Sequence, residues 1–236
     1  RNRKDAGGKE TFKKVLKKAR FLQNAGVNVN ILCVLTKQSA RKIRSIYNFL
    51  KKQGFYYQQY IPCLDPLGEE RGGRPWSLTP EDYGNALKEL FDLWYRDMME
   101  GQRVSVREFD NWLAMLGGNP PEACAQMGRC SMQNIIEANG DVFPCDFYVL
   151  DQYRTGNVRD EDFRFFREDL STIRFLAEGK ERGRACPSCQ WYPLCRGGCR
   201  RDYTPEGENY FCRAYQEFFQ YAIERLEKLA AITFGF

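Results

Sequence analysis

"CPSCQWYPLCRGGCR" at residues 186–200 places four cysteines within fourteen residues, in a chain of 236 residues that contains no histidine. The four cysteines are separated by two, five and three residues. A disulfide framework, zinc sites and an iron–sulfur cluster can all use such a pattern. The rest of the chain is needed to choose between them.

The overall composition is typical of a globular protein. Apolar residues make up 43% of the chain, charged residues 28%, and the formal net charge is +5. A chain of this length can bury one large core, or one core and a smaller module. No run of about eighteen apolar residues could span a bilayer, and no stretch has the charged start and apolar centre of a secretory leader. We therefore expect a cytoplasmic protein without a membrane partner.

The densest basic stretch is "KKVLKKAR" at residues 13–20. Its lysines alternate with apolar residues at helical spacing, which is typical of the solvated face of an amphipathic helix. We expect this helix to face water, and we expect no nucleic-acid partner.

In the first third of the chain, helix-forming stretches alternate with strand-forming stretches. We expect helices over residues 11–24 and 39–54, the second capped by Ser39, and strands over residues 27–35 and 55–64. Short connections between such elements predict parallel strands with helices packed outside them. Two such units could complete a (β/α) barrel begun upstream. The chain has no initiating Met, so we expect the C-terminal part of a longer protein.

Near residue 118 the sequence changes from helix-forming to loop- and hairpin-forming segments, which predicts a domain boundary. Before it, Thr79 precedes a proline and begins a helix that we expect to run to about Glu100. After it, Asn139-Gly140 lies between two short apolar runs, which indicates a β-hairpin. A last helix is expected over about 212–230. We predict one domain over residues 1–117 and another over residues 118–236.

Eight of the ten cysteines lie after residue 123, which allows two sites of four thiolates each. Cys33 lies in an apolar strand and is expected to be a core residue, whereas Cys63 ends a strand and could face a cavity. Disulfides are disfavoured, because disulfide scaffolds are usually short secreted chains and this chain has a large expected core. Four-sulfur sites bind zinc or iron–sulfur clusters, and the local spacing alone leaves both open.

The complete cysteine pattern resembles the seven-cysteine signature of the SPASM domain, the auxiliary-cluster module of many radical S-adenosylmethionine (SAM) enzymes. Nine residues separate Cys130 from Gly140, and four more precede Cys145. The later spacings also fit, and Cys124 resembles the eighth ligand of members with two complete [4Fe–4S] clusters. The positions that carry this pattern after the gap are Cys186, Cys189, Cys195, Cys199 and Cys212.

Within that superfamily the chain resembles anaerobic sulfatase-maturating enzymes. The resemblance rests on "QYIPCLDPLG" (59–68), "NGDVFPCDFYVLDQYRTGNV" (139–158) and the opening "RNRKDAGGKETF" (1–12). It implies an α/β fold: the C-terminal part of a partial radical SAM barrel, followed by a small cysteine-rich SPASM domain with a hairpin and helices. The CxxxCxxC motif and the glycine-rich SAM strand of that family are absent from this sequence. We expect SAM and a third [4Fe–4S] cluster to be bound mainly by upstream residues.

The resemblance also implies ligands and partners. Arg3 matches a position near the SAM carboxylate. The substrate would be a sulfatase polypeptide, and the electron acceptor a small protein such as ferredoxin or flavodoxin. The first auxiliary cluster would be bound by Cys124, Cys130, Cys145 and Cys199, and the second by Cys186, Cys189, Cys195 and Cys212.

Asp146 is the residue that the resemblance implies for catalysis. In this family a cysteine or serine of the sulfatase becomes Cα-formylglycine: a 5′-deoxyadenosyl radical removes a Cβ hydrogen, a base takes the thiol or hydroxyl proton, and an electron leaves. The aspartate after the third cluster cysteine is the implied base. A nearby cluster of negative charge makes a carboxylate a stronger base. The alternative is a carboxylate that only accepts a backbone hydrogen bond, and Asp65 is the next candidate base.

Two other function classes stay open at this stage. One is another SPASM peptide-modifying enzyme, for example one that forms thioether crosslinks. The other is a non-catalytic module with two zinc or two cluster sites that serves binding or electron transfer. The stretch "QYIPCLDPLG" favours sulfatase maturation over the first alternative.

Overall fold

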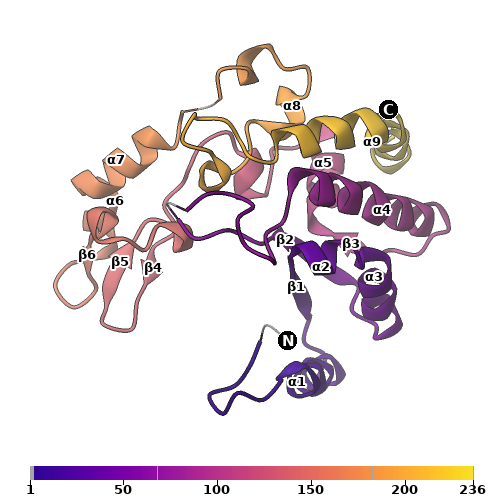
Figure 1. Cartoon of the computed structure of the whole chain (residues 1–236), viewed down its shortest axis with the longest axis horizontal. Coiled ribbons are helices and arrows are strands. Elements are labelled where there is room, and N and C mark those ends of the chain that lie inside the picture. Colours follow the sequence, from indigo (N-terminus) through magenta and orange to yellow (C-terminus); the bar gives the residue numbers. More distant parts are fainter. Residues whose placement is uncertain (1–2, 68, 182, 236) are drawn as a thin grey trace.

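The computed structural model describes residues 3–67, 69–181 and 183–235. Arg1, Asn2 and Gly68 belong to stretches quoted above and lie outside the described residues, as do Arg182 and Phe236. The described chain is a mixed α/β structure with two three-stranded sheets: the sheet of β1, β2 and β3 lies beside the long helices, and the sheet of β4, β5 and β6 lies apart from it, at the left of Figure 1.

The first sheet is parallel and has the strand order β1-β2-β3. Its register pairs Asn30 with Tyr57 and Leu35 with Pro62. Helices connect the strands, as expected for parallel neighbours, so the predicted helix–strand alternation is confirmed. The elements of this part are α1 (Phe12–Asn24), β1 (Asn30–Leu35), α2 (Lys37–Ala40), α3 (Ile43–Lys52), β2 (Tyr57–Pro62) and β3 (Ser105–Val106).

The prediction that Ser39 caps the second helix was wrong, because the chain forms two helices there. Thr36 is the N-cap of the short α2: its hydroxyl accepts a hydrogen bond from the Ser39 N–H at 3.3 Å, and the Ser39 hydroxyl accepts one from the Thr36 N–H at 2.7 Å. This reciprocal pair is a capping box. Ser39 therefore lies inside α2, and α3 begins later, at Ile43, without a side-chain cap.

The largest core lies between three helices that come from distant parts of the chain. The helix α4 begins directly after its predicted cap, Thr79, whose hydroxyl accepts from the Asp82 N–H at 3.1 Å. Phe109 and Phe218 stack with ring centroids 5.7 Å apart, which joins α5 to α9. The last helix thus packs into the same core as the first half of the chain (Figure 1). The three helices are α4 (Pro80–Met99), α5 (Arg107–Leu116) and α9 (Cys212–Phe234).

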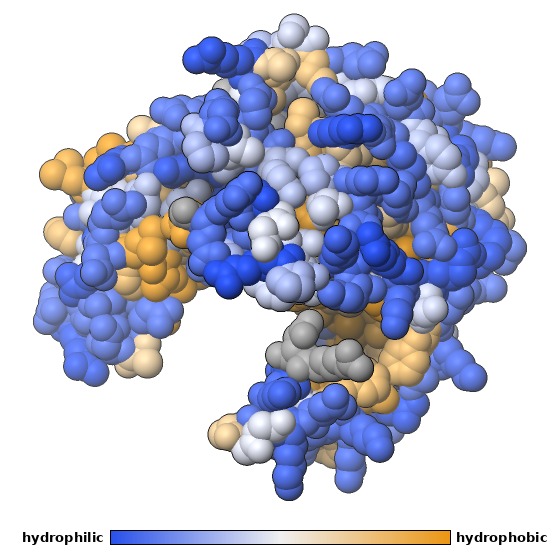
Figure 2. Space-filling model, viewed as in Figure 1, coloured by the Kyte–Doolittle hydropathy of each residue, from blue (hydrophilic) through white to orange (hydrophobic). Residues whose placement is uncertain are grey.

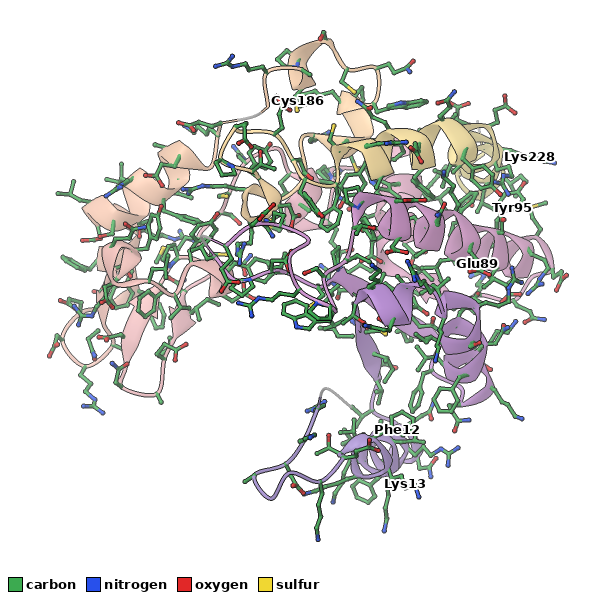
Figure 3. The ribbon with its side chains drawn as sticks, viewed as in Figure 1. Phe12, Lys13, Glu89, Tyr95, Cys186 and Lys228 are labelled. Carbon is green, nitrogen blue, oxygen red and sulfur yellow. The ribbon has the colours of Figure 1, made fainter. Side chains whose placement is uncertain are left out.

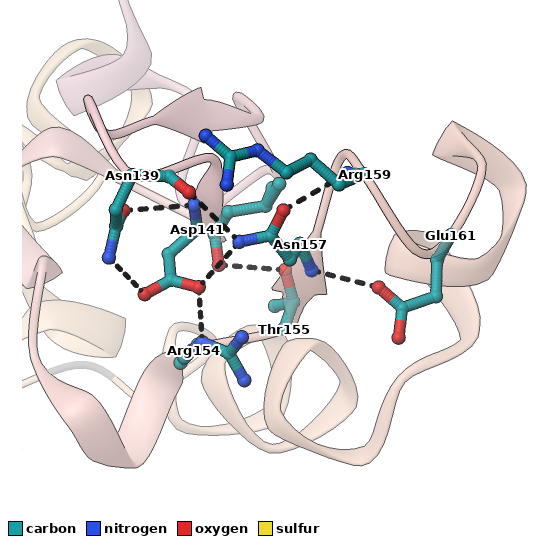
Figure 4. A network of polar contacts seen from close by, with 8 residues as sticks. Asn139, Asp141, Arg154, Thr155, Asn157, Arg159 and Glu161 are labelled. Carbon is teal, nitrogen blue, oxygen red and sulfur yellow. Dashed lines mark hydrogen bonds and ion pairs between the residues drawn. The ribbon is translucent and has the colours of Figure 1, made fainter.

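The predicted hairpin at Asn139-Gly140 is confirmed, and a third strand extends it. Gly140 has φ +92°, and an added Cβ would lie 2.7 Å from the Asn157 side-chain oxygen. Asp141 accepts hydrogen bonds from Asn139 at 2.7 Å, Arg154 at 2.6 Å and Asn157 at 3.1 Å, which tie the turn to the third strand (Figure 4). The strands of this antiparallel sheet are β4 (Ile135–Ile136), β5 (Asp141–Phe143) and β6 (Gly156–Asn157).

Short helices fill the region that follows this sheet. Two α-helices, α6 (Phe163–Glu168) and α7 (Leu170–Glu178), occupy the gap between the two cysteine groups, and α8 (Tyr192–Cys195) lies in the cysteine-rich loop. The remaining turns are the 3-10 helices η1 (Cys124–Gln126), η2 (Asp146–Tyr148), η3 (Asp151–Tyr153), η4 (Cys186–Ser188) and η5 (Arg200–Asp202).

A hollow opens between the hairpin sheet and α1 (Figure 2). Apolar side chains of the parallel sheet are exposed: Leu32 to 59%, Val34 to 53% and Tyr57 to 53%. Parallel sheets are usually covered on both faces, and the described residues cover only one face of this sheet. No helix within the described ranges is both long enough and apolar enough to span a bilayer.

Candidate metal centres

Four cysteines of the second expected group line one cavity. This cavity lies between the cysteine-rich loop and the first turn of α9, near Cys186 in Figure 3. Its other walls include Trp191, Tyr192 and Tyr215, so the thiols share an enclosure rich in aromatic side chains. The cysteines that line it are Cys186, Cys189, Cys195 and Cys212.

The pKa values of these thiols reflect the same grouping. Burial raises the pKa of Cys195 to about 12, and the neighbouring thiols of Cys212, Cys186 and Cys189 add to the rise. Burial also raises the pKa of Cys212, with further contributions from Cys186 and Cys189. Thiols with raised pKa values are protonated at neutral pH, so a metal that binds here as a thiolate complex must displace protons.

The first expected group also converges, from segments that are far apart in sequence. Burial raises the pKa of Cys199, and Asp202, Cys124 and Cys130 add to the effect. Burial raises the pKa of Cys145 to about 12, with contributions from Asp146 and Cys124. The structure therefore brings Cys124, Cys130, Cys145 and Cys199 into one neighbourhood.

The loop that joins the two groups has an unusual backbone. Arg196, Gly197 and Gly198 follow one another with φ values of +50°, +86° and +71°. Glycine adopts this left-handed region without strain, and at Gly198 an added Cβ would lie 2.4 Å from the Asn209 amide nitrogen. This turn directs Cys195 to one group and Cys199, four residues later, to the other.

A single zinc ion and a four-iron cluster place different demands on four thiolates. In the part of the chain that the structure describes, no three Cys, His, Asp or Glu side chains lie close enough together to hold one metal ion. Zinc binds sulfur at about 2.3 Å, so its four thiolates must stand about 4 Å apart. In a four-iron cluster each thiolate binds a different iron, so the sulfurs stand farther apart. Cys124 is exposed, the other seven cysteines of the two groups are half-buried, and all eight are free thiols, so each group has the four thiols that a [4Fe–4S] cluster requires.

The two candidate carboxylates lie in different environments. Asp146 begins η2, is exposed, and its Oδ1 lies 3.5 Å from the Cys145 Sγ. Asp65 is only 3% exposed: it accepts from the Gly72 N–H at 3.0 Å and from the Ser77 hydroxyl. The Asp65 carboxylate is thus engaged in closing its own loop, whereas Asp146 can reach a reactant.

Arg3 lies on the side of the molecule opposite the second cysteine group (Figure 3). Its carbonyl accepts from the Thr11 N–H at 3.3 Å, which keeps this exposed residue beside the start of α1. Phe12 and Lys13, which follow directly, lie at the opposite side of the molecule from Cys186 (Figure 3). Of the other two cysteines, Cys33 packs against the main core, and burial raises the pKa of the half-buried Cys63.

Two residues near the first group were not foreseen from the sequence. Gly179 ends α7 and accepts a hydrogen bond from the Cys130 N–H at 3.2 Å. Arg200 follows Cys199 and donates to Glu178 at 2.6 Å. Only the position of Arg200, directly after an expected cluster cysteine, could have drawn attention to it.

Comparisons with known proteins agree with this geometry. Residues 124–190 match the SPASM family, described as an iron–sulfur cluster-binding domain. The cysteine-type anaerobic sulfatase-maturating enzyme of Clostridium perfringens is 42% identical over 97% of this chain and 63% of its own length. Over nearly its whole length the chain is similar to anaerobic sulfatase-maturating enzymes, and it contains a match to the SPASM domain.

Further members of this family match at lower identity or in structure. The serine-type anaerobic sulfatase-maturating enzyme of Bacteroides thetaiotaomicron is 27% identical over 93% of this chain and 58% of its own length. A solved structure of native anSMEcpe with bound AdoMet and Cp18Cys peptide has a TM-score of 0.93 at 42% identity, over 98% of this chain and 66% of that one. The radical SAM fold class with a SPASM domain is thus confirmed, and the chain spans about 63% of its cysteine-type relative.

Proposed function

We propose that the protein containing this chain oxidises a cysteine or serine of a sulfatase polypeptide to Cα-formylglycine by radical SAM chemistry. The observation that carries the proposal is the convergence of eight cysteines into two groups of four, in a chain that is 42% identical to a cysteine-type maturase over 97% of its length. The greater identity to the cysteine-type than to the serine-type relative, 42% against 27%, favours a cysteine substrate.

We assign one auxiliary [4Fe–4S] cluster to each cysteine group. When bound, the auxiliary clusters would accept the electron released on oxidation, and SAM with its own cluster would supply the hydrogen-abstracting radical. This chain's contribution is to hold the clusters in enclosures of low polarity and to fix their separation through the turn at Arg196–Gly198. The cysteines proposed as ligands are Cys124, Cys130, Cys145 and Cys199 for the first and Cys186, Cys189, Cys195 and Cys212 for the second.

Asp146 is the proposed base that takes the substrate's thiol or hydroxyl proton. Its exposure and its position directly beside a cluster cysteine support this role. A carboxylate there lies near the acceptor of the electron, so the proton and the electron leave the substrate in the same region. The hydrogen bonds that already engage Asp65 make it a poorer candidate.

Four further expectations stay predictions. They are the division at residue 118, the approach of Arg3 to SAM, the cytoplasmic location, and a ferredoxin or flavodoxin as the electron acceptor. Among the described residues the order β1-β2-β3 leaves one edge of β1 without a paired strand. Further barrel strands would pair with that edge, so that the exposed face of the sheet would line the barrel interior.

The direct test uses the protein that contains this chain, reconstituted anaerobically with iron and sulfide. A cysteine-containing sulfatase peptide and its serine counterpart are incubated with SAM and a reductant, and the products are analysed by mass spectrometry. We expect formylglycine in the cysteine peptide, together with 5′-deoxyadenosine. A thioether crosslink in place of formylglycine would favour another SPASM-type activity, and an unmodified peptide with intact SAM cleavage would contradict the proposal.

A further inference from the structure

Arg200 is held rigidly beside the first cysteine group. It follows Cys199, and its Nη2 donates to the Glu178 carboxylate at 2.6 Å and to the Tyr153 hydroxyl at 3.0 Å. Its Nη1 is buried and has no hydrogen-bond partner within the described ranges. A buried guanidinium N–H without an acceptor is costly, so its surroundings should contain an acceptor when the site is complete.

The same aromatic rings contact both the guanidinium and the cluster cysteines. The Arg200 guanidinium carbon lies 4.9 Å from the ring centroid of Tyr148, 5.7 Å from that of Phe175 and 5.8 Å from that of Tyr153. Cys130 and Cys145 pack against this ring cluster. The rings therefore fix the cation and two thiols in one small, dry unit.

The charges around Arg200 do not cancel. Glu178 is the carboxylate that pairs with it, but Glu178 also accepts from Arg174 at 2.8 Å. Two guanidinium groups against one carboxylate leave one positive charge. The Arg200 side chain is 20% exposed and the Arg174 side chain 59%, so the cation nearer the cysteines is also the one less screened by water.

We propose that Arg200 is a positioning residue that raises the reduction potential of the first auxiliary cluster, an inference that rests on the proposed assignment of that cluster. Reduction adds one electron, and hence one negative charge, to a group already bound by four thiolates. A fixed cation in a poorly polarisable environment stabilises the more negative state, and nearby charge and hydrogen bonds are known determinants of cluster potential. Glu178 and Tyr153 hold the cation in place.

The test is a redox titration with dithionite on the anaerobically reconstituted protein, followed by electron paramagnetic resonance. Arg200→Gln is expected to move one of the auxiliary-cluster couples to a lower potential and leave the other unchanged. At a fixed solution potential the ratio of reduced to oxidised first cluster should fall roughly tenfold, which is about 59 mV for a one-electron couple. Arg174→Gln, which removes the exposed cation from the same carboxylate, should shift it much less.

Two further measurements keep the outcome decisive. Iron and sulfide content of the parent protein tests the cluster assignment separately: a parent that binds zinc without sulfide would overturn the cluster assignment and this inference with it, whereas an iron-replete parent leaves the role of Arg200 to be decided by the potentials. If Arg200→Gln loses iron, Arg200→Lys becomes the test variant. A first-cluster potential near the parent value in Arg200→Lys then supports the proposal, because lysine keeps the positive charge. An unchanged potential in iron-replete Arg200→Gln, or an equal fall in Arg200→Lys, would overturn it.

Discussion

Gly179 lies directly against Cys130. An added Cβ on Gly179 would stand 2.4 Å from the Cys130 Cβ and 2.7 Å from its Sγ, and the Gly179 carbonyl accepts from the Cys130 N–H. A side chain at residue 179 and a correctly placed thiol at residue 130 cannot coexist without movement. The end of α7 thus sets the position of one proposed cluster ligand.

Gly179→Ala should therefore weaken the first cluster and spare the second. Overpacking of this kind typically costs about 1–3 kcal/mol, and here the atom that must move is a ligand. We expect the iron content to fall by about four irons per chain after reconstitution. Gly73→Ala is the matched control, since its nearest neighbour is 3.5 Å away. Full iron content in Gly179→Ala would show that Cys130 does not need this contact.

The iron stoichiometry tests the two-cluster assignment as a whole. Two [4Fe–4S] clusters predict about eight irons and eight sulfides per chain. Cys199→Ala and Cys189→Ala should each remove one cluster, one from each group, whereas Cys33→Ala should keep both, because Cys33 belongs to the main core. Two zinc ions without sulfide would refute the iron–sulfur assignment.

Local signals in the sequence predicted the elements near strong caps and turns. Thr79 before Pro80 and Asn139 before Gly140 mark the start of α4 and the hairpin correctly. The prediction of Ser39 as the cap was wrong because Thr36, three residues earlier, is an equally good cap and directly follows the last residue of β1. Local propensity does not decide between two adjacent caps; the position of the strand does.

The supports of the site could not be predicted in this way. Gly179 contacts Cys130, which lies 49 positions earlier in the chain, and Arg200 contacts Glu178, which lies 22 positions earlier. Such contacts depend on how α7 packs against the aromatic rings, which leaves no periodic trace in the sequence. The cysteine spacing was informative because it follows a pattern that is characteristic of a family. The residues that surround the cysteines need only be close to them in space, so they leave no such pattern in the sequence.

Glu108, in the first turn of α5, predicts a pH dependence of stability. Burial raises its pKa from 4.5 to about 7, and its Oε2 is buried without a hydrogen-bond partner inside the described segments. The folded state holds this proton more tightly than the unfolded state. The loss of stability caused by ionising the buried Glu108 carboxyl is therefore absent below about pH 4.5 and grows as the pH rises. Between pH 6 and pH 8 it increases by about 1 kcal/mol.

Glu108→Gln should remove this contribution, so the fall in urea midpoint between the two pH values should be smaller than in the parent. Some fall should remain, because burial also raises the pKa of Asp110 to about 6. Glu227→Gln, an exposed substitution on α9, should leave the parent slope unchanged. Equal slopes in the parent and in Glu108→Gln would mean that the carboxyl is hydrated in solution.

Asp146→Asn tests the proposed base in the complete protein. The substitution keeps the size and most hydrogen bonds of the side chain but removes the carboxylate that would accept the proton. General-base contributions are typically about 10²–10⁴-fold, so formylglycine formation should fall by roughly that factor. SAM cleavage should largely persist, because it precedes the proton transfer, and iron content should not change, because Asp146 is not a proposed ligand.

The informative measurement follows 5′-deoxyadenosine and modified peptide in the same reaction, with iron content determined beforehand. Asp151→Asn is the matched control, since Asp151 is also exposed and also begins a 3-10 turn close to Asp146. Near-parent formylglycine in Asp146→Asn would place the base elsewhere, and Asp65→Asn would then be the next variant. Loss of iron would instead mean that Asp146 supports the Cys145 loop through its 3.5 Å contact with the thiol, which is the purely structural role.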